Sequence, residues 1–175
     1  MFCDEGLGAY AVRYIEKNYT LPSNLEVVEG GTLGFTLMTY YQEYDKIIVV
    51  GTGSHEGESG SILHETAEDI LAKGPIRKTA NEVEITMMIE ICSFSENMGE
   101  VELVTMVPDD IVSVKNGLSQ RTLKSMPEFI ERIVAVLQEN NLSLELKEQK
   151  VSLEEIIEEF ANPTQISFQP EERSV

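Results

Sequence analysis

Three glycine-containing loops hold the residues of this sequence that are best suited to chemistry. They are residues 4–8, 30–32 and 51–60, and their candidate site residues are Glu5, Gly30, Gly31, Thr32, Gly51 and His55. A carboxylate between glycines, as at Glu5, is poorly explained by packing, so we interpret it as functional. His55 has the side chain of a metal ligand, but a histidine needs convergent partners to bind a metal. An exposed loop histidine is the simpler interpretation.

Other catalytic schemes fit the sequence less well. A serine hydrolase of the α/β type needs Gly-x-Ser-x-Gly after a strand, and the loop at 51–60 lacks this spacing. Cys92 falls on an apolar helical stripe, which predicts a buried and inert thiol, and Cys3 has no histidine assigned to it. The sequence contains no HExxH zinc motif and no Gly-Lys-Ser/Thr phosphate loop. The catalytic group is therefore unknown from these patterns.

A strand–helix–strand pattern positions the second and third loops. Residues 25–29 alternate like a strand, 33–44 have helical spacing, and 47–50 are apolar on both faces. This pattern is typical of a βαβ unit with a right-handed crossover, and a run apolar on both faces belongs in the middle of a parallel sheet. Ligands of such sheets gather at the carboxyl ends of the strands. We therefore expect the three loops to converge on one cleft.

Further helices and strands complete an α/β pattern. Helices are predicted at residues 9–17, 66–73, 79–94 and 152–160, and strands at 61–64 and 100–107. Ser125 to Glu128 has the form of a capping box with Pro127 in the first turn, which predicts that a fresh helix starts there and runs to about residue 140. His64 falls on the short strand, where a structural role is expected.

Composition narrows the class of protein. The chain has 175 residues, enough for one domain with a sizeable core, and a formal net charge of −18. Nucleic-acid binding needs clustered Lys and Arg, and a membrane span needs about 18 consecutive apolar residues. Neither is present. Two distant cysteines without a CxxC motif indicate a reducing compartment. We expect a cytoplasmic monomer that binds no nucleic acid and spans no membrane.

Five motifs in order give the sequence a resemblance to a known family. They are Asp4-Glu5-Gly6-x-Gly, Glu29-Gly30-Gly31-Thr32, Asp45-Lys46-Ile47-Ile48-Val49-Val50, Val107-Pro108 and Gly117-Leu118-Ser119. Together they resemble the nickel–iron hydrogenase maturation endopeptidases. The resemblance implies a three-layer α/β/α sandwich on a mixed, mostly parallel sheet, with residues 1–142 as the protease-like domain. It also implies removal of a C-terminal peptide from the hydrogenase large-subunit precursor, its partner, after nickel insertion.

The resemblance further implies that a Glu, an Asp and a His of the protease sense the nickel held in the substrate, with no cofactor of the protease itself. The family's Glu matches Glu5. The position of the family's Asp is occupied by Gly51, and the position of its His falls near Asn81. Glycine offers no side-chain donor, and asparagine offers only a neutral amide oxygen. The candidate metal residues are therefore Glu5, Asn81 and His55, and the candidate substrate-binding residues are Gly30, Gly31, Thr32 and Gly51. The alternative is a non-catalytic relative that binds the large subunit or an accessory protein.

Two expectations concern the ends of the chain. In the family, a first strand precedes the Asp-Glu-Gly loop and lies between the strands that match residues 25–29 and 46–50. Only three residues precede Asp4 here, so this strand is missing from the sequence. We expect either that the edges of the two flanking strands close onto each other or, by preference, that the natural reading frame starts upstream of Met1. Unpaired backbone groups would otherwise cost about 1–3 kcal/mol each. Residues 143–175 are predicted to be an acidic extension with one short helix. Truncation after Leu142 is expected to leave a folded domain.

Overall fold

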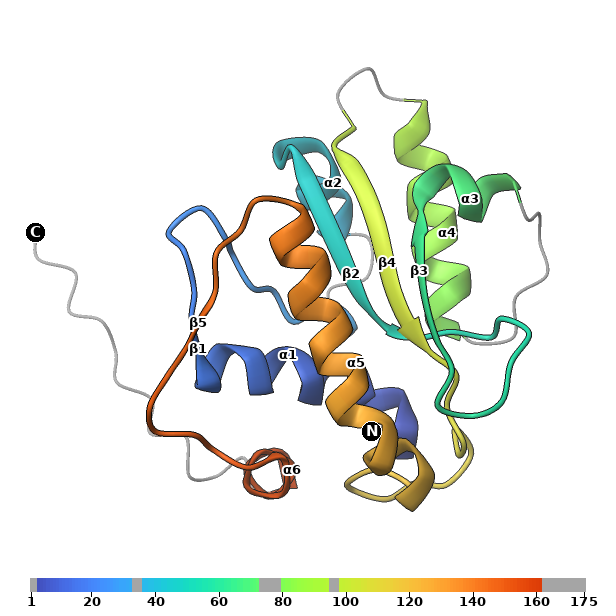
Figure 1. Ribbon diagram of the computed structural model, residues 1–175. Coiled ribbons are helices and arrows are strands. Elements are labelled where there is room, and N and C mark those ends of the chain that lie inside the picture. The colour runs from blue at the N-terminus through green and yellow to red at the C-terminus, as the bar shows by residue number, and fades with distance from the viewer. Residues whose placement is uncertain (1–2, 33–35, 73–79, 95–97, 162–175) are drawn as a thin grey trace, which may run out of the picture.

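A small mixed sheet forms the centre of the molecule (Figure 1). The computed structural model describes residues 3–32, 36–72, 80–94 and 98–161. The sheet contains β2 (Lys46–Thr52), β4 (Glu100–Met106) and β3 (Ile62–Thr66) in the order β2-β4-β3. β2 runs parallel to β4, and β3 runs antiparallel to it. The mixed α/β architecture predicted from the sequence is confirmed.

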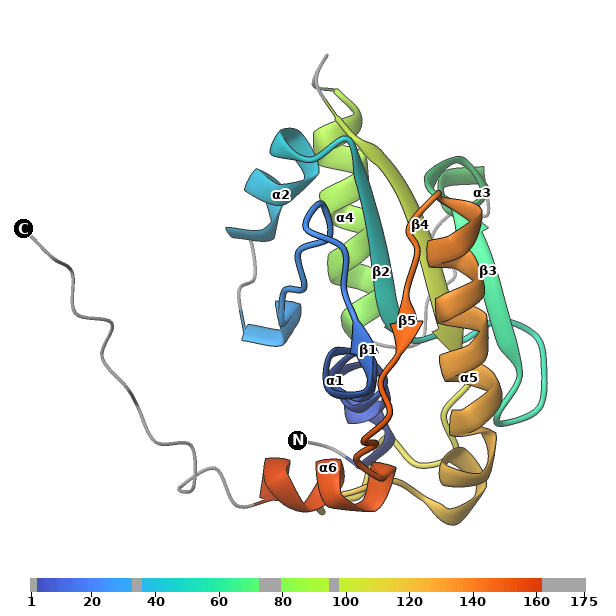
Figure 2. The ribbon, with the colours of Figure 1, turned by 60° about the vertical axis from the view of Figure 1, so that its left-hand side comes forward.

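Helices cover both faces of this sheet (Figures 1 and 2). On one face, α1 (Leu7–Asn18) and α5 (Gln120–Glu139) pack on Val104 and Met106 of β4. On the other face lie α2 (Leu37–Glu43), α3 (Ala67–Ala72) and α4 (Ala80–Ser93), which share a second core with Val101 and Leu103. Because β4 contributes to both cores, it is the buried central strand. No helix in the described part of the chain is long and apolar enough to cross a bilayer.

Two predictions about the βαβ unit are wrong. Residues 25–29 form no strand, and β2 lies at an edge of the sheet instead of in its middle. Every residue from Lys46 to Gly51 is only partly buried, whereas β4 is mostly buried. The alternation at 25–29 reflects one-sided burial, since Leu25 packs on the α1–α5 core. A strand also needs a neighbouring backbone to which it can hydrogen-bond. Among the described strands β2 pairs with β4 alone, so the segment 25–29 and β2 have not closed onto each other.

The predicted restart of a helix at Ser125 is also wrong, because α5 is continuous from Gln120. Ser119 caps it, with its side-chain oxygen accepting a hydrogen bond from Thr122 N at 3.2 Å. Pro127 lies inside this helix with its side chain exposed to solvent. The local capping pattern at Ser125 is therefore overridden by the packing of the whole helix on the sheet.

His64 has the structural role that its position predicted. Its Nε2 lies 2.8 Å from Glu102 Oε2, and its Nδ1 lies 2.8 Å from an Arg132 guanidinium nitrogen. Arginine can only donate, so Nδ1 accepts, and Nε2–H donates to the carboxylate. Lys46 Nζ bonds the other oxygen of Glu102 at 2.6 Å and Asn140 Oδ1 at 2.6 Å. This network ties β2, β3 and β4 to α5.

The C-terminal extension packs on the same core as the rest of the chain. Its short strand β5 (Glu145–Leu146) pairs with β1 (Tyr19–Thr20), and α6 (Leu153–Ala161) lies against α1. Ile156 is fully buried, and the Phe160 ring meets the Tyr10 ring edge-on with centroids 5.2 Å apart. The helix therefore covers part of the main core.

This packing reverses the expectation for truncation after Leu142. Removing the extension exposes the α1 surface that Ile156 covers and breaks the 3.0 Å ion pair between Arg13 and Glu159. We expect Ile156→Ala alone to cost about 2–5 kcal/mol, and the truncation to cost more. The melting temperature should fall by about 10 °C in Ile156→Ala, as measured by circular dichroism. Glu154→Ala, at an exposed position of the same helix, is the control and should change little.

Candidate active site

The first predicted loop lies against the carboxyl end of β2. It forms a short 3-10 helix, η1 (Cys3–Gly6), which contacts β2 and leads directly into α1. A Cβ atom added at Gly8 would lie 2.5 Å from Val50 O and 3.0 Å from the Cα of Gly51. Only glycine permits this close approach, so Gly8 fixes the loop that carries Glu5 beside Gly51. The backbone of this loop and the end of β2 are therefore neighbours, and a cleft shared by Glu5 and Gly51 stays a prediction.

Asp4, next to Glu5, is the most heavily hydrogen-bonded carboxylate near this end of the sheet. It is completely buried. Its donors are Asp109 N at 3.0 Å, Asp110 N at 2.8 Å, Ser119 N at 2.7 Å and the Thr122 hydroxyl at 2.7 Å. Asp4 N also donates to Asp110 O at 3.0 Å. One side chain thus ties η1 to the turn after β4 and to the start of α5.

The surroundings of Asp4 favour the ionised form of its carboxyl group. Burial alone raises the pKa of its carboxyl group, but the hydrogen bonds from Ser119, Asp110 and Thr122 outweigh burial and hold the pKa below its usual value. The sequence pattern indicated Glu5 as the functional carboxylate and did not indicate Asp4. The only signal available was the acidic pair itself, and adjacent residues of a turn face different directions.

Glu5 itself is left available for chemistry. Its side chain is partly buried, and it forms no hydrogen bond or ion pair with the described residues. Asp4 satisfies the surrounding backbone donors, so the carboxylate of Glu5 is free to accept a proton or to bind a cation. The neighbouring thiol is not a competitor, because burial raises the pKa of Cys3, as it does that of Cys92.

The end of β2 has open space at Gly51. A Cβ atom added at Gly51 would meet no atom within 4 Å, so a side chain fits there. Thr52 follows with 1% of its surface exposed, and its buried hydroxyl has no hydrogen-bond partner among the described residues. A Cβ at Gly53 would collide with Thr105 Oγ1 at 2.5 Å. The strand end is therefore open at Gly51 and closely packed at Gly53.

Two further candidate residues, His55 and Asn81, lie on other segments near the carboxyl end of β2. His55 packs within its own loop, where a Cβ at Gly53 would lie 3.3 Å from Nδ1, and both ring nitrogens are shielded from solvent. Asn81 lies in the first turn of α4, which begins at the end of the sheet where β2 and β4 finish (Figure 1). In the part of the chain that the structure describes, no three His, Cys, Asp or Glu residues are grouped to hold a metal ion.

The second predicted loop forms its own 3-10 turn, η2 (Gly30–Thr32). A Cβ added at Gly30 would lie 3.3 Å from the Leu37 side chain of α2, and one at Gly31 would meet nothing within 4 Å. The turn is thus held by α2. That Gly30, Gly31 and Thr32 bind substrate together with Glu5 stays a prediction.

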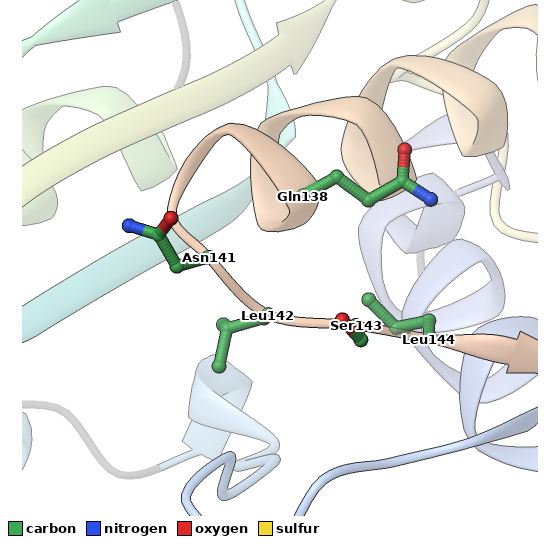
Figure 3. A pocket seen from close by; sticks show the side chains of 5 residues that line it. All are labelled: Gln138, Asn141, Leu142, Ser143 and Leu144. Atoms are coloured by element: carbon green, nitrogen blue, oxygen red, sulfur yellow. The ribbon is translucent and has the colours of Figure 1, made fainter.

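A pocket of about 420 Å³ lies elsewhere. Its lining comes from the end of α5 and the segment after it: Gln138, Asn141, Leu142, Ser143 and Leu144 (Figure 3). Asn140 beside it bonds Lys46 at the first residue of β2. The pocket is therefore at the opposite end of β2 from Glu5, and we do not assign the chemistry to it.

The open position at Gly51 allows a direct test of the two positions that lack donors. We expect Gly51→Asp combined with Asn81→His to create or strengthen affinity for nickel or zinc, because Glu5 would then gain a carboxylate and an imidazole as partners. Calorimetric titration of the folded protein measures the affinity. Each single substitution is the control and should bind more weakly than the pair. A double variant that binds no better than the unmodified chain would show that these two positions do not face Glu5.

Comparison with known proteins gives one consistent family. Residues 9–136 match a family model described as hydrogenase maturation protease. The hydrogenase expression/formation protein HupD of Rhizobium leguminosarum bv. viciae is 24% identical over 162 residues, which cover 90% of this chain and 79% of that protein. The Hydrogenase 2 maturation protease of Escherichia coli K12 is 22% identical over 144 residues, covering 81% and 87%. HupD of Bradyrhizobium diazoefficiens is 34% identical over 62 residues, which span only 32% of that relative.

Solved structures share the fold. The hydrogenase maturating endopeptidase HybD from E. coli superimposes with a TM-score of 0.74 at 20% identity, over 83% of this chain and 91% of that one. HybD from Thermococcus kodakarensis gives 0.62 at 20% identity, over 78% and 91%. At this level of identity the similarity establishes the architecture of the chain alone.

Proposed function

This chain belongs to the hydrogenase maturation protease family and is thus a peptidase. We propose that it removes the C-terminal peptide of a nickel–iron hydrogenase large-subunit precursor once nickel is inserted. The observation that carries the proposal is the family match over residues 9–136. The relatives with the longest alignments are named for hydrogenase formation or maturation. The alternative of a non-catalytic binding protein is not favoured by these comparisons.

We propose that the precursor binds and is cleaved at the end of the sheet where Glu5 lies. Glu5 follows the anchored Asp4 and has no described partner of its own. Its turn, η1, contacts β2, and the next helix packs its Gly8 on Val50 and Gly51. An extended segment of the precursor that enters there would meet a carboxylate able to accept a proton from water or to bind a metal. Its backbone could also approach the glycine closely.

Nickel belongs to the substrate in this proposal. Glu5 would supply one oxygen ligand, and the precursor's own ligands would supply the others, because Gly51 has no donor and the described residues form no metal cluster. The protease therefore needs no resident cofactor. Two buried free cysteines are compatible with our proposal that the protein acts as a monomer in the cytoplasm.

The test is incubation with the nickel-loaded precursor, followed by mass spectrometry of its C-terminus. We expect a single cleavage that releases one C-terminal peptide. The same precursor without nickel is the control and should stay intact. Binding without any cleavage of the nickel-loaded form would support the non-catalytic alternative and overturn the proposal.

A further inference from the structure

The outer side of α4 presents an apolar stripe to solvent. Met87 is 45% exposed, Ile91 is 43% exposed, and Phe94, directly after the helix, is 91% exposed. Their spacing of four and then three residues puts them on one side of a helix. Leu71 of α3, which packs beside α4, is 38% exposed and extends the apolar surface. We call these four residues the α4 face.

The opposite side of α4 is apolar as well. Met88, Ile89 and Cys92 are at least 97% buried in the core shared with α2, α3 and β4. A helix that is apolar all round is typical of a position between two layers. In the described part of the chain, α4 has a layer on its inner side only (Figure 2). The outer side therefore has the composition of a contact surface.

Among the described residues, the charged side chains of the helices that form the α4 face and its surroundings are all acidic. Helices α2, α3 and α4 contain no Lys or Arg, and their acidic residues are Glu43, Glu68, Asp69, Glu82, Glu84 and Glu90. Of these, Glu43, Glu68, Asp69 and Glu90 are exposed. The basic residues of 73–79 lie outside the described residues. An apolar stripe with an acidic border matches an apolar surface bordered by Lys and Arg.

Charge also argues against a second copy of this chain on the α4 face. Each chain has a formal net charge of −18, and two equal acidic borders would repel each other. The partner is therefore a different protein. Because α4 begins at the end of the sheet where β2 and β4 finish, a partner lying along α4 extends toward the Glu5 end (Figure 1).

We propose that the α4 face docks the folded body of the hydrogenase large-subunit precursor through an apolar surface bordered by basic residues. This inference rests on the proposed function and adds a second contact to it, away from the scissile peptide. Docking holds the precursor at the protease before any peptide enters the site. It is independent of nickel, so the nickel-free precursor binds here even though it is not cleaved.

The experiment uses the full chain and the full-length nickel-free precursor as the binding probe. The variant carries Ile91→Ser and Phe94→Ser, and because both side chains are exposed we expect an unchanged melting temperature. The dissociation constant, measured by calorimetry, should rise at least about tenfold, as at interface hot spots. Leu146→Ser is the matched control, because Leu146 is 49% exposed and lies on β5, on the other side of the molecule. It should bind like the unmodified chain.

A second variant tests the charges without removing apolar surface. Glu90→Lys should slow association and weaken the dependence of its rate on salt. On nickel-loaded precursor, the Ile91/Phe94 variant should raise KM and leave kcat unchanged. An unmodified chain that cleaves the nickel-loaded precursor while both α4 variants keep full affinity would overturn the docking inference alone. Absence of cleavage by the unmodified chain would instead overturn the proposed function. A variant that changes only the chain's own sedimentation mass would assign the face to self-association and also overturn the inference.

Discussion

Replacing Glu5 by glutamine should reduce processing of the nickel-loaded precursor by at least about a hundredfold, the size of effect seen when one preorganised polar group is removed from an active site. The substitution keeps the shape of the side chain and removes its charge. Glu5 contributes no described hydrogen bond or ion pair, so the free energy of unfolding should change by less than about 0.5 kcal/mol. Cleavage is measured by mass spectrometry under single-turnover conditions, and stability by urea unfolding.

Glu56→Gln is the matched control for this experiment. Glu56 is an exposed glutamate in the loop that follows β2, so its substitution removes the same charge from a position to which we assign no role. Processing by this variant should match that of the unmodified chain. Full activity in Glu5→Gln would remove Glu5 from the site, and a large drop in its stability would make the residue structural.

Replacing Asp4 by alanine should have the largest effect on stability of any single substitution at this end of the sheet. It leaves the backbone N–H groups of Asp109, Asp110 and Ser119 without their buried acceptor, and also the hydroxyl of Thr122. Breaking a buried charged network costs about 3–5 kcal/mol. The melting temperature should fall by about 10 °C or more. Because Glu5 then loses its support, activity should fall at temperatures where the variant is still folded.

The contribution of Asp4 should also depend on pH in a defined direction. Its pKa is lower in the folded chain than in the unfolded chain, so the ionised carboxylate stabilises the fold above the unfolded value of about 3.9. This stability is lost as the pH falls through the folded pKa. The difference in unfolding free energy between the unmodified chain and Asp4→Asn should be constant from about pH 5 to pH 8 and shrink below about pH 4. A difference that grows on acidification would contradict this assignment.

The sequence predicted single helices and strands better than it predicted which segments pair or pack with them. The apolar run at residues 47–50 is a strand as its pattern indicates, but its place at the sheet edge depends on which other segments supply backbone hydrogen bonds. For the same reason residues 25–29, which alternate like a strand, form none. Ser125 carries a helix-start pattern that the continuous packing of α5 overrides.

The candidate site could be predicted only in part. The glycines around Glu5 indicated a loop at a strand end, and the structure places that loop beside Gly51. The sequence could not show that Asp4 is the buried member of the acidic pair, because this depends on donors more than a hundred residues away. It also could not show that Ile156 of the extension covers the core of α1 and α5, since amphipathic spacing does not identify the surface that a helix meets.

Among the described strands β2 is paired on one side only, and this should be measurable in the exchange of its backbone hydrogens with solvent deuterium. In a strand that is paired on one side, alternate N–H groups point toward the partner and the others point outward. Along β2 the amides that face β4 should therefore exchange slowly and those between them quickly, whereas both sets should be protected in the central strand β4. The same outward row of donors and acceptors, flanked by isoleucines and valines, is a template for fibril growth when the protein is concentrated or warmed.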